Sequence, residues 1–259
     1  MITLSEAQIL GWLTTWLLPV FRILGVMATA PILSSRNIPA RAKIALAMVL
    51  AIAIAPFAPT PEGFSLASSA AWPAVVKEVI VGAALGFLVR LVMLTFEVAG
   101  ELIGLQIGLS YAGYFTPGAA SGNAVGALSG LIASWLFVTL NGPLLLIGCL
   151  VKSYERFPSG LTSQSNLAQA SASTIDPMKI ISLLTDIFGM ALVLAIPVVT
   201  LLLLINFAMG VASKVAPQIN LFAVGFPILM LCGLGMFAFV IPLFEPMMNH
   251  GLELVFSIW

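Results

Sequence analysis

Long, nearly uncharged apolar runs constrain the fold of this sequence more than any other feature. A helix needs about 20 apolar residues, at about 1.5 Å per residue, to cross about 30 Å of membrane hydrocarbon. Six runs approach or exceed this length, at about residues 7–33, 42–58, 73–96, 125–151, 179–209 and 218–243. We therefore expect an all-α, polytopic membrane protein with about six hydrophobic helices arranged as helical hairpins.

The composition indicates that apolar material surrounds much of the chain. Hydrophobic residues make up 61% of the 259 positions and charged residues only 8%, whereas soluble domains carry about 25% charged residues. The ten basic and ten acidic side chains form no clustered basic face, which excludes a nucleic-acid partner. Cys149, Cys232 and the single His250 are far apart in the sequence, so we expect no disulfide, no metal site and no cofactor.

Three prolines lie well inside the predicted spans, at Pro19, Pro197 and Pro227. Proline removes a backbone donor and bends a helix. In apolar surroundings the freed carbonyl groups need neighbouring protein or water. We therefore expect kinked helices that pack against other helices rather than straight helices surrounded by lipid.

The basic residues between spans predict an orientation. Connection 34–43 is the most basic part of the chain, and Lys214 follows the fifth span. Because short cytoplasmic loops are rich in Lys and Arg, both positions are predicted to be cytoplasmic, which places the N-terminus on the periplasmic side. The long polar connection 152–178 disagrees with this topology, since it would lie outside although basic residues border it, namely Lys152, Arg156 and Lys179.

Two sets of glycines repeat every four residues, one just after the third span and one around the start of the next. Each set shares one helix face, which lets a second backbone approach closely. Contacts within the chain are the commoner cause of such spacing. We therefore predict helix packing and local flexibility at Gly100, Gly104, Gly108, Gly122 and Gly126.

Charged residues inside the spans are few, and Arg22 and Asp186 are the most deeply placed. Such residues pair with one another or mark an ion or proton path. We expect pairing within a helical bundle, because no matching set of acids and bases indicates a transporter. Glu97 and Glu101 share one helix face. They either line a polar pathway or lie hydrated at the interfacial end of the third span, where Arg90 could pair with Glu97.

An aromatic segment interrupts the apolar pattern after the third span. Residues 110–123 hold a Thr-Pro-Gly turn and a run of Ala, Ser and Gly. Irregular backbone at membrane depth survives only against protein or a water-filled path, and apolar constrictions can close such a path. This segment is therefore either an interfacial loop with tyrosine anchors or a constriction loop built on Tyr111, Tyr114, Phe115, Thr116 and Pro117.

Four sequence blocks resemble a known protein family. They are SSRNIPARAKIALA, GELIGLQIGLSYAGYFTPG, FVTLNGPLLLIGCLVKSYERFPSG and KVAPQINLFAVGFP, in this order across nearly the whole chain. These blocks are similar to the FliR/SctT family of type III secretion export-gate proteins. The Asn-Gly-Pro and Phe-Pro-Ser-Gly details favour the flagellar branch of the family over the injectisome branch.

The resemblance implies a subunit of a helical export-gate assembly in the bacterial inner membrane, at the flagellar basal body. FliP-like and FliQ-like subunits, with FlhB-like and FlhA-like components, would complete a channel for unfolded flagellar proteins. Residues 1–178 would form a FliP-like part and residues 179–259 a FliQ-like hairpin. Segment 110–123 would be a plug that closes the channel. Independently of the resemblance, Lys214, Gln218 and Asn220 are candidate polar interface residues, and Asn220 could form a hydrogen bond between helices.

Two other function classes compete with the export gate. A secondary transporter needs inverted repeats or a dense polar site within the membrane, and the sequence holds no convincing repeat. An intramembrane enzyme needs a Ser/His, HExxH or paired-Asp arrangement, for which the lone His250 leaves too little. We therefore expect a structural channel subunit without catalytic residues, with an injectisome homologue as the nearest alternative.

Overall fold

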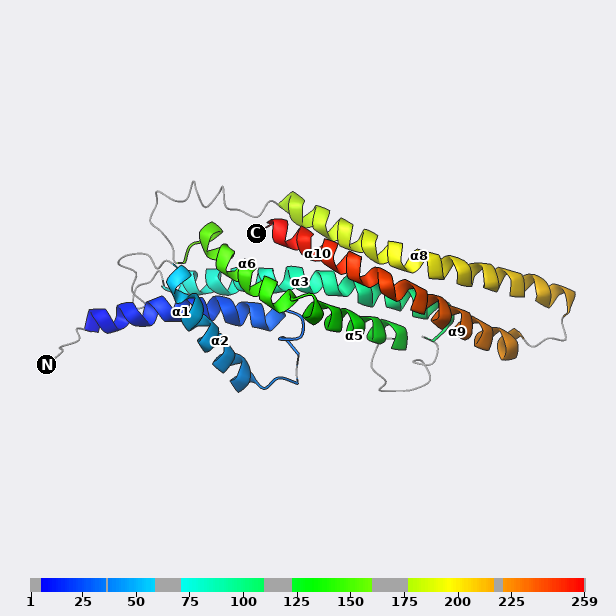
Figure 1. The fold of residues 1–259 in the computed structure, drawn as a ribbon, viewed down its shortest axis with the longest axis horizontal. Coiled ribbons are helices and arrows are strands. Elements are labelled where there is room, and N and C mark those ends of the chain that lie inside the picture. Colours follow the sequence, from blue (N-terminus) through cyan, green and yellow to red (C-terminus); the bar gives the residue numbers. More distant parts are fainter. Residues whose placement is uncertain are drawn as a thin grey trace. The chain divides into compact units, whose positions relative to one another are not determined.

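The computed structural model describes residues 6–35, 37–58, 71–109, 123–159, 177–216 and 221–258. Within these ranges every regular element is a helix (Figure 1), which confirms the predicted all-α class. Two short 3-10 helices, η1 (Ala55–Phe57) and η3 (Ile241–Leu243), accompany the α-helices. These are α1 (Glu6–Thr29), α2 (Ala40–Ile54), α3 (Ala71–Ile107), α5 (Ala124–Thr139), α6 (Gly142–Arg156), α8 (Pro177–Val215), α9 (Leu221–Val240) and α10 (Phe244–Ile258).

Four helical segments among the described residues are long and apolar enough to cross a membrane. The pair α5 and α6 makes a fifth if it is counted as one bent span, and Trp16–Thr29 of α1 is a shorter apolar helix. The described residues thus hold four or five candidate spans, whereas the sequence has six apolar runs. The four are Ala40–Phe57, Ala71–Ile107, Ile181–Val215 and Ala223–Ser257.

Two helices continue beyond the ends expected from the apolar runs. α3 extends to Ile107 rather than ending near residue 96, so Glu97 and Glu101 lie inside it. The last run was expected to end near residue 243, yet η3 leads directly into α10. A charged residue ends an apolar run without ending a helix, because a helix continues wherever its backbone hydrogen bonds continue.

The prolines predicted inside spans do lie inside helices, Pro19 in α1, Pro197 in α8 and Pro227 in α9. A break without a proline at its centre lies between α5 and α6, whose axes differ by 67°. Asn141 adopts a left-handed conformation there, with φ 57°. Its carbonyl accepts the N–H groups of Leu144 and Leu145, both at 3.0 Å. Pro143 lies in the first turn, where a missing N–H is tolerated.

Contacts within the chain define two compact units, the first of which comprises Met1–Arg90, Asn141–Ile180 and Leu254–Trp259. In this unit α1 packs against α3 at glycines. A Cβ atom at Gly82 would overlap the Arg22 carbonyl oxygen, and one at Gly86 would lie 2.7 Å from the Val26 carbonyl oxygen. The absence of these side chains lets the two backbones meet, as glycine faces do in membrane helices.

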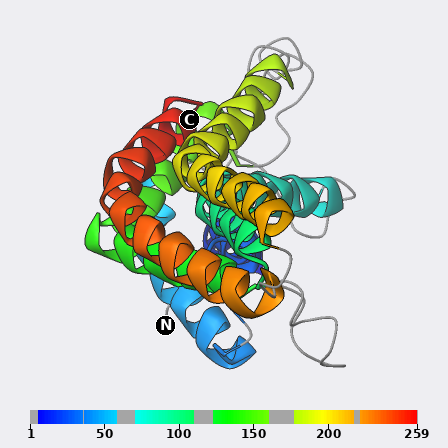
Figure 2. The ribbon, with the colours of Figure 1, turned by 90° about the vertical axis from the view of Figure 1, so that its right-hand side faces the viewer.

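The second unit comprises Leu91–Leu140 and Ile181–Glu253. Phe244 is central to its core, with ring centroids 4.9 Å from Phe96 and 6.2 Å from Phe237. α8 and α9 run antiparallel as a helical hairpin, which Figures 1 and 2 both show. Close contact between the two helices is seen at Gly225, where a Cβ atom would lie 3.0 Å from the sulfur of Met209.

Candidate functional site

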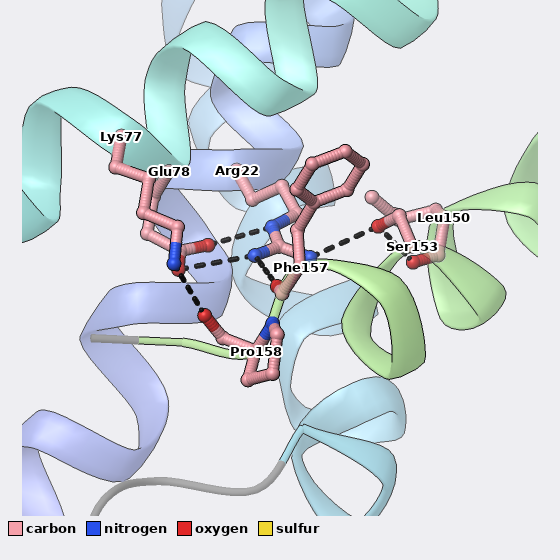
Figure 3. Close-up of polar contacts among 7 residues, drawn as sticks. All are labelled: Arg22, Lys77, Glu78, Leu150, Ser153, Phe157 and Pro158. Carbon is pink, nitrogen blue, oxygen red and sulfur yellow. Dashed lines mark hydrogen bonds and ion pairs between the residues drawn. The ribbon is translucent and has the colours of Figure 1, made fainter. Parts of the chain in front are cut away.

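A buried ion pair joins α1 to α3 in the first unit (Figure 3). The Arg22 guanidinium donates from Nε to Glu78 Oε2 at 2.6 Å and from Nη2 to Glu78 Oε1 at 3.1 Å. Both side chains are 0% exposed. Two parallel bonds of this kind are the strongest arrangement that an arginine and a carboxylate form.

The remaining guanidinium donors bind α6 and the turn that follows it. Nη1 of Arg22 donates to Ser153 Oγ at 3.0 Å, and Nη2 donates to the Phe157 carbonyl oxygen at 2.7 Å. The guanidinium also lies over the Tyr154 ring, 3.9 Å from its centroid, a cation–π arrangement. Beside it, Lys77 Nζ donates to the Pro158 carbonyl oxygen at 2.9 Å. Figure 3 shows Arg22 and Lys77 reaching the carbonyl oxygens of Phe157 and Pro158, two consecutive residues.

The network has a structural consequence for the first unit. A buried charge is tolerated only when it is paired and hydrogen-bonded. The partners of Arg22 come from two other helices, α3 and α6, and from the turn after α6. Gly82, one turn after Glu78, makes the pairing possible, because its missing side chain lets α1 approach α3 at the level of Arg22. The cluster therefore fixes α1, α3 and α6 against one another.

A second polar arrangement lies in the second unit, along the seam between α3 and α5. Glycines of each helix receive polar side chains of the other. A Cβ atom at Gly126 would lie 2.6 Å from Glu101 Oε1, and one at Gly130 would lie 2.9 Å from Glu97 Cγ. The same occurs in the opposite direction, since a Cβ atom at Gly104 would overlap the Asn123 side chain. The space beside these regularly spaced glycines is thus filled by side chains of the same chain.

Glu101 and Asn123 form the polar end of this seam. The Asn123 amide Nδ2 donates to Glu101 Oε2 at 2.8 Å and to the Glu101 carbonyl oxygen at 2.9 Å, and the backbone N–H of Asn123 donates to Oε1 at 3.3 Å. Asn123 also caps α5, because its Oδ1 accepts the Gly126 N–H at 2.8 Å. Asparagine is among the most favoured residues at a helix N-cap.

The family of this protein follows from its similarity to known sequences. A sequence model of the family described as "Bacterial export proteins, family 1" matches residues 13–255. The chain belongs to this family. Among its curated relatives, the flagellar biosynthetic protein FliR of Escherichia coli (strain K12) is 36% identical over 262 residues, covering 100% of this chain and 96% of that protein.

Two further relatives extend the comparison for this export protein. FliR of Pectobacterium carotovorum subsp. carotovorum is 34% identical over 100% of this chain and 96% of the relative. FliR of Bacillus subtilis (strain 168) is 26% identical over 85% of this chain and 83% of the relative. The similarity therefore extends along the chain and is not confined to one helix or one motif.

The structure places the other predicted site residues of this export protein as follows. Asp186 and Lys214 are both exposed on α8. Gly108 ends α3 with a φ of 92°. Glu97 is exposed and Glu101 half-buried within α3, and Arg90 donates to Ser34 Oγ at 3.4 Å. Outside the described residues lie Tyr111, Tyr114, Phe115, Thr116, Pro117, Gly122, Gln218 and Asn220.

Sequence reasoning missed the partners that complete the buried cluster. Arg22 stands out in the sequence as a charge within the first apolar run, and Glu78 is a charge within the third. Since an isolated charge is costly at such depth, their opposite signs were the available signal for a pair. Ser153 and the Phe157 carbonyl oxygen carried no such signal, because hydroxyl and backbone groups occur throughout the chain. Among the described residues, no group of three or more His, Cys, Asp or Glu side chains is placed to hold a metal ion.

Proposed function

We propose that this chain is a membrane subunit of the flagellar type III protein export gate. FliP-like and FliQ-like subunits, with FlhB-like and FlhA-like components, would surround it, and unfolded flagellar proteins would pass through the shared channel. The observation that carries the proposal is the similarity along nearly the whole chain to relatives named as flagellar biosynthetic proteins, within a family of bacterial export proteins.

The length of α8 supports the presence of protein partners. Its candidate span, Ile181–Val215, has 35 residues, or about 52 Å of helix at about 1.5 Å per residue. Large apolar side chains are exposed from one end to the other, with Ile181 56% and Val215 82% exposed. Hydrocarbon is about 30 Å thick and helices tilt by up to about 40°. Lipid alone therefore leaves part of this apolar face uncovered, and apolar helices of neighbouring subunits would cover it.

The mechanism we propose is steric and requires no catalytic residue. Segment 110–123 follows α3 and leads into α5, and its aromatic residues Tyr111, Tyr114 and Phe115 would close the channel until an exported chain displaces them. The proposal assigns residues 1–178 to the FliP-like part and residues 179–259 to the FliQ-like hairpin. The α8–α9 hairpin is consistent with the second assignment. The basic connection 34–43 would face the cytoplasm and the N-terminus the periplasm.

Deletion of the aromatic part of the segment tests this proposal. The chain is co-expressed with its FliP-like and FliQ-like partners, and the assembled complex is reconstituted in planar bilayers. Deleting Tyr114–Ser121 should produce a steady ion conductance that the wild-type complex lacks. The matched control removes the same number of residues from the polar connection between α6 and α8, Thr162–Gln169. A deletion complex that assembles and stays closed would refute the proposal that the segment is a plug. Failure of the wild-type chain to co-purify with either partner would refute the proposal that it is a subunit of the export gate.

A further inference from the structure

We propose that Lys43 and Arg90 bind the phosphate of an anionic phospholipid, whose acyl chains lie along an exposed apolar face of α3. Both cations belong to the first unit, as do the apolar residues beside them. Such a lipid site is separate from the channel function proposed above, and it would exist in the chain by itself as well as in an assembled gate.

The two cations meet at the connection between α1 and α2. Lys43 Nζ donates to the Ser35 carbonyl oxygen at 3.1 Å, and Arg90 Nη1 donates to Ser34 Oγ at 3.4 Å. Because Ser34 and Ser35 are consecutive, side chains from α2 and α3 reach the same point of the chain. A guanidinium has five N–H donors and an ammonium has three, so most of their hydrogen-bonding capacity is left for a ligand.

The surroundings of these cations hold little negative charge. Neither forms an ion pair with a carboxylate in the described part of the chain. The sequence has no Asp or Glu between Glu6 and Glu62, and none between Glu78 and Glu97. Clustered Lys and Arg side chains at the end of membrane helices attract the headgroups of anionic lipids. The pair is therefore a positive site whose missing partner is an anion.

An exposed apolar stripe leads from Arg90 back toward the start of α3. At about 100° per residue, Trp72, Ile80 and Phe87 lie within about 80° of Arg90 around the helix, and all are exposed, Trp72 by 78% and Ile80 by 60%. From Trp72 to Arg90 the helix rises about 27 Å, close to the about 30 Å of membrane hydrocarbon. Tryptophan and basic side chains favour the two membrane interfaces. Arg90 therefore lies where a lipid headgroup would be.

α2 extends the site on the same side of the cations. α1 runs parallel to α3, because successive turns of α1 meet Gly82 and Gly86 in that order, and α2 turns back toward the start of α3 (Figure 1). One turn after Lys43, Leu46 is exposed. Apolar side chains of both helices thus follow the cations in one direction, as acyl chains follow a headgroup. A free phosphate ion would leave this apolar face uncovered, so a phospholipid matches both halves of the site.

Lipid binding to the full chain, with any partner that co-purifies, tests the proposal. The chain is kept in a neutral detergent, and native mass spectrometry measures the fraction that carries a bound lipid. Dioleoyl phosphatidylglycerol should bind about tenfold or more tightly than the neutral dioleoyl phosphatidylcholine. Lys43→Gln and Arg90→Gln should each weaken phosphatidylglycerol binding about fivefold, the factor that one cation near a membrane surface contributes, and should leave phosphatidylcholine binding unchanged.

Arg41→Gln is the matched control. Arg41 is exposed in the first turn of α2, but it precedes Lys43 by two positions and therefore lies on nearly the opposite side of the helix. Its loss should leave phosphatidylglycerol binding nearly unchanged. An equal loss with Arg41→Gln and Arg90→Gln would overturn the site, because general surface charge would then explain the binding.

Three further outcomes decide the identity of the occupant. Equal affinity of the wild-type chain for the two lipids would overturn the proposal, and this comparison needs no variant to fold. Displacement of phosphatidylglycerol by inorganic phosphate would indicate a free-anion site instead. Binding of phosphatidylglycerol to the chain alone but not to its complex would show that an acidic side chain of a neighbouring subunit fills the site. Retained binding in the complex, in the presence of phosphate, supports the lipid.

Discussion

Replacing Glu78 with glutamine probes the buried cluster of the first unit most directly. The substitution keeps the shape of the side chain and one oxygen acceptor for the Arg22 guanidinium, but it removes the negative charge. Arg22 would then remain 0% exposed, with Ser153 Oγ, the Phe157 carbonyl oxygen, the Tyr154 ring and a neutral amide around it but without the carboxylate that balances its charge.

The expected loss is about 3 kcal/mol in the free energy of unfolding, at the lower end of the about 3–5 kcal/mol that removal of one partner costs in a buried pair. Removing both charges should recover much of it. In Arg22→Met/Glu78→Leu no charge is buried alone, and Ser153 Oγ still donates to the Leu150 carbonyl oxygen at 2.6 Å. The Phe157 carbonyl oxygen loses its partner, so a deficit of about 1–3 kcal/mol relative to the wild type should remain.

The measurement is unfolding in detergent micelles by increasing fractions of sodium dodecyl sulfate, followed by the helical circular dichroism signal. Glu155→Gln is the matched control, because Glu155 is exposed on α6 in the same unit and surface changes stay within about 0.5 kcal/mol. A Glu78→Gln variant as stable as this control would refute the assignment of a desolvated pair. A double variant less stable than Glu78→Gln would refute the argument that the uncompensated charge is the main loss.

Four further substitutions test the packing of the helices and the backbone conformation at Asn141. Gly82→Val should prevent the first unit from forming, because a Cβ atom there overlaps the Arg22 backbone. Gly210→Ala, which has open space at its Cβ position, should be neutral or stabilise the protein by up to about 1 kcal/mol. The rate of proteolysis in micelles distinguishes the two variants. Asn141→Gly should keep the bend and stability of the wild type, since glycine also accepts a φ of 57°, and a large loss in the same unfolding titration would contradict this. Phe244→Ala should lower the free energy of unfolding by about 3–5 kcal/mol, since Phe244 is 1% exposed at the centre of the second unit, and a loss below about 1 kcal/mol would show that its ring contacts are dispensable.

Local features of the fold were predictable from the sequence. Apolar runs of spanning length predict helices that satisfy their own backbone groups in an apolar environment, and all described regular elements are helical. The ends of α3 and of the last helices were less predictable, because Glu97 and the end of the last apolar run mark changes in hydropathy, whereas the helices continue through them. The length of an apolar run therefore indicates where a helix crosses apolar surroundings, and it does not indicate where the backbone hydrogen bonds of that helix end.

The pairing of helices could not be predicted in the same way. A soluble helix shows which face is buried through its apolar stripe, but in this chain most helices are apolar all round, so several faces are equivalent in sequence. Arg22 and Glu78 are 56 positions apart, and Glu101 and Asn123 are 22 apart. Glycine spacing indicated that close approaches exist without indicating which side chains fill them.

The order of residues thus predicts a series of apolar helices, with a few charges and glycines at defined positions. That Arg22 meets Glu78, Ser153 and the Phe157 backbone, and that Asn123 meets Glu101, is known only from the packing of the helices. The physical reason is one of range. Hydropathy and helix-forming hydrogen bonds act between near neighbours, whereas a buried charge acquires its partner only when separate helices pack closely enough to exclude water.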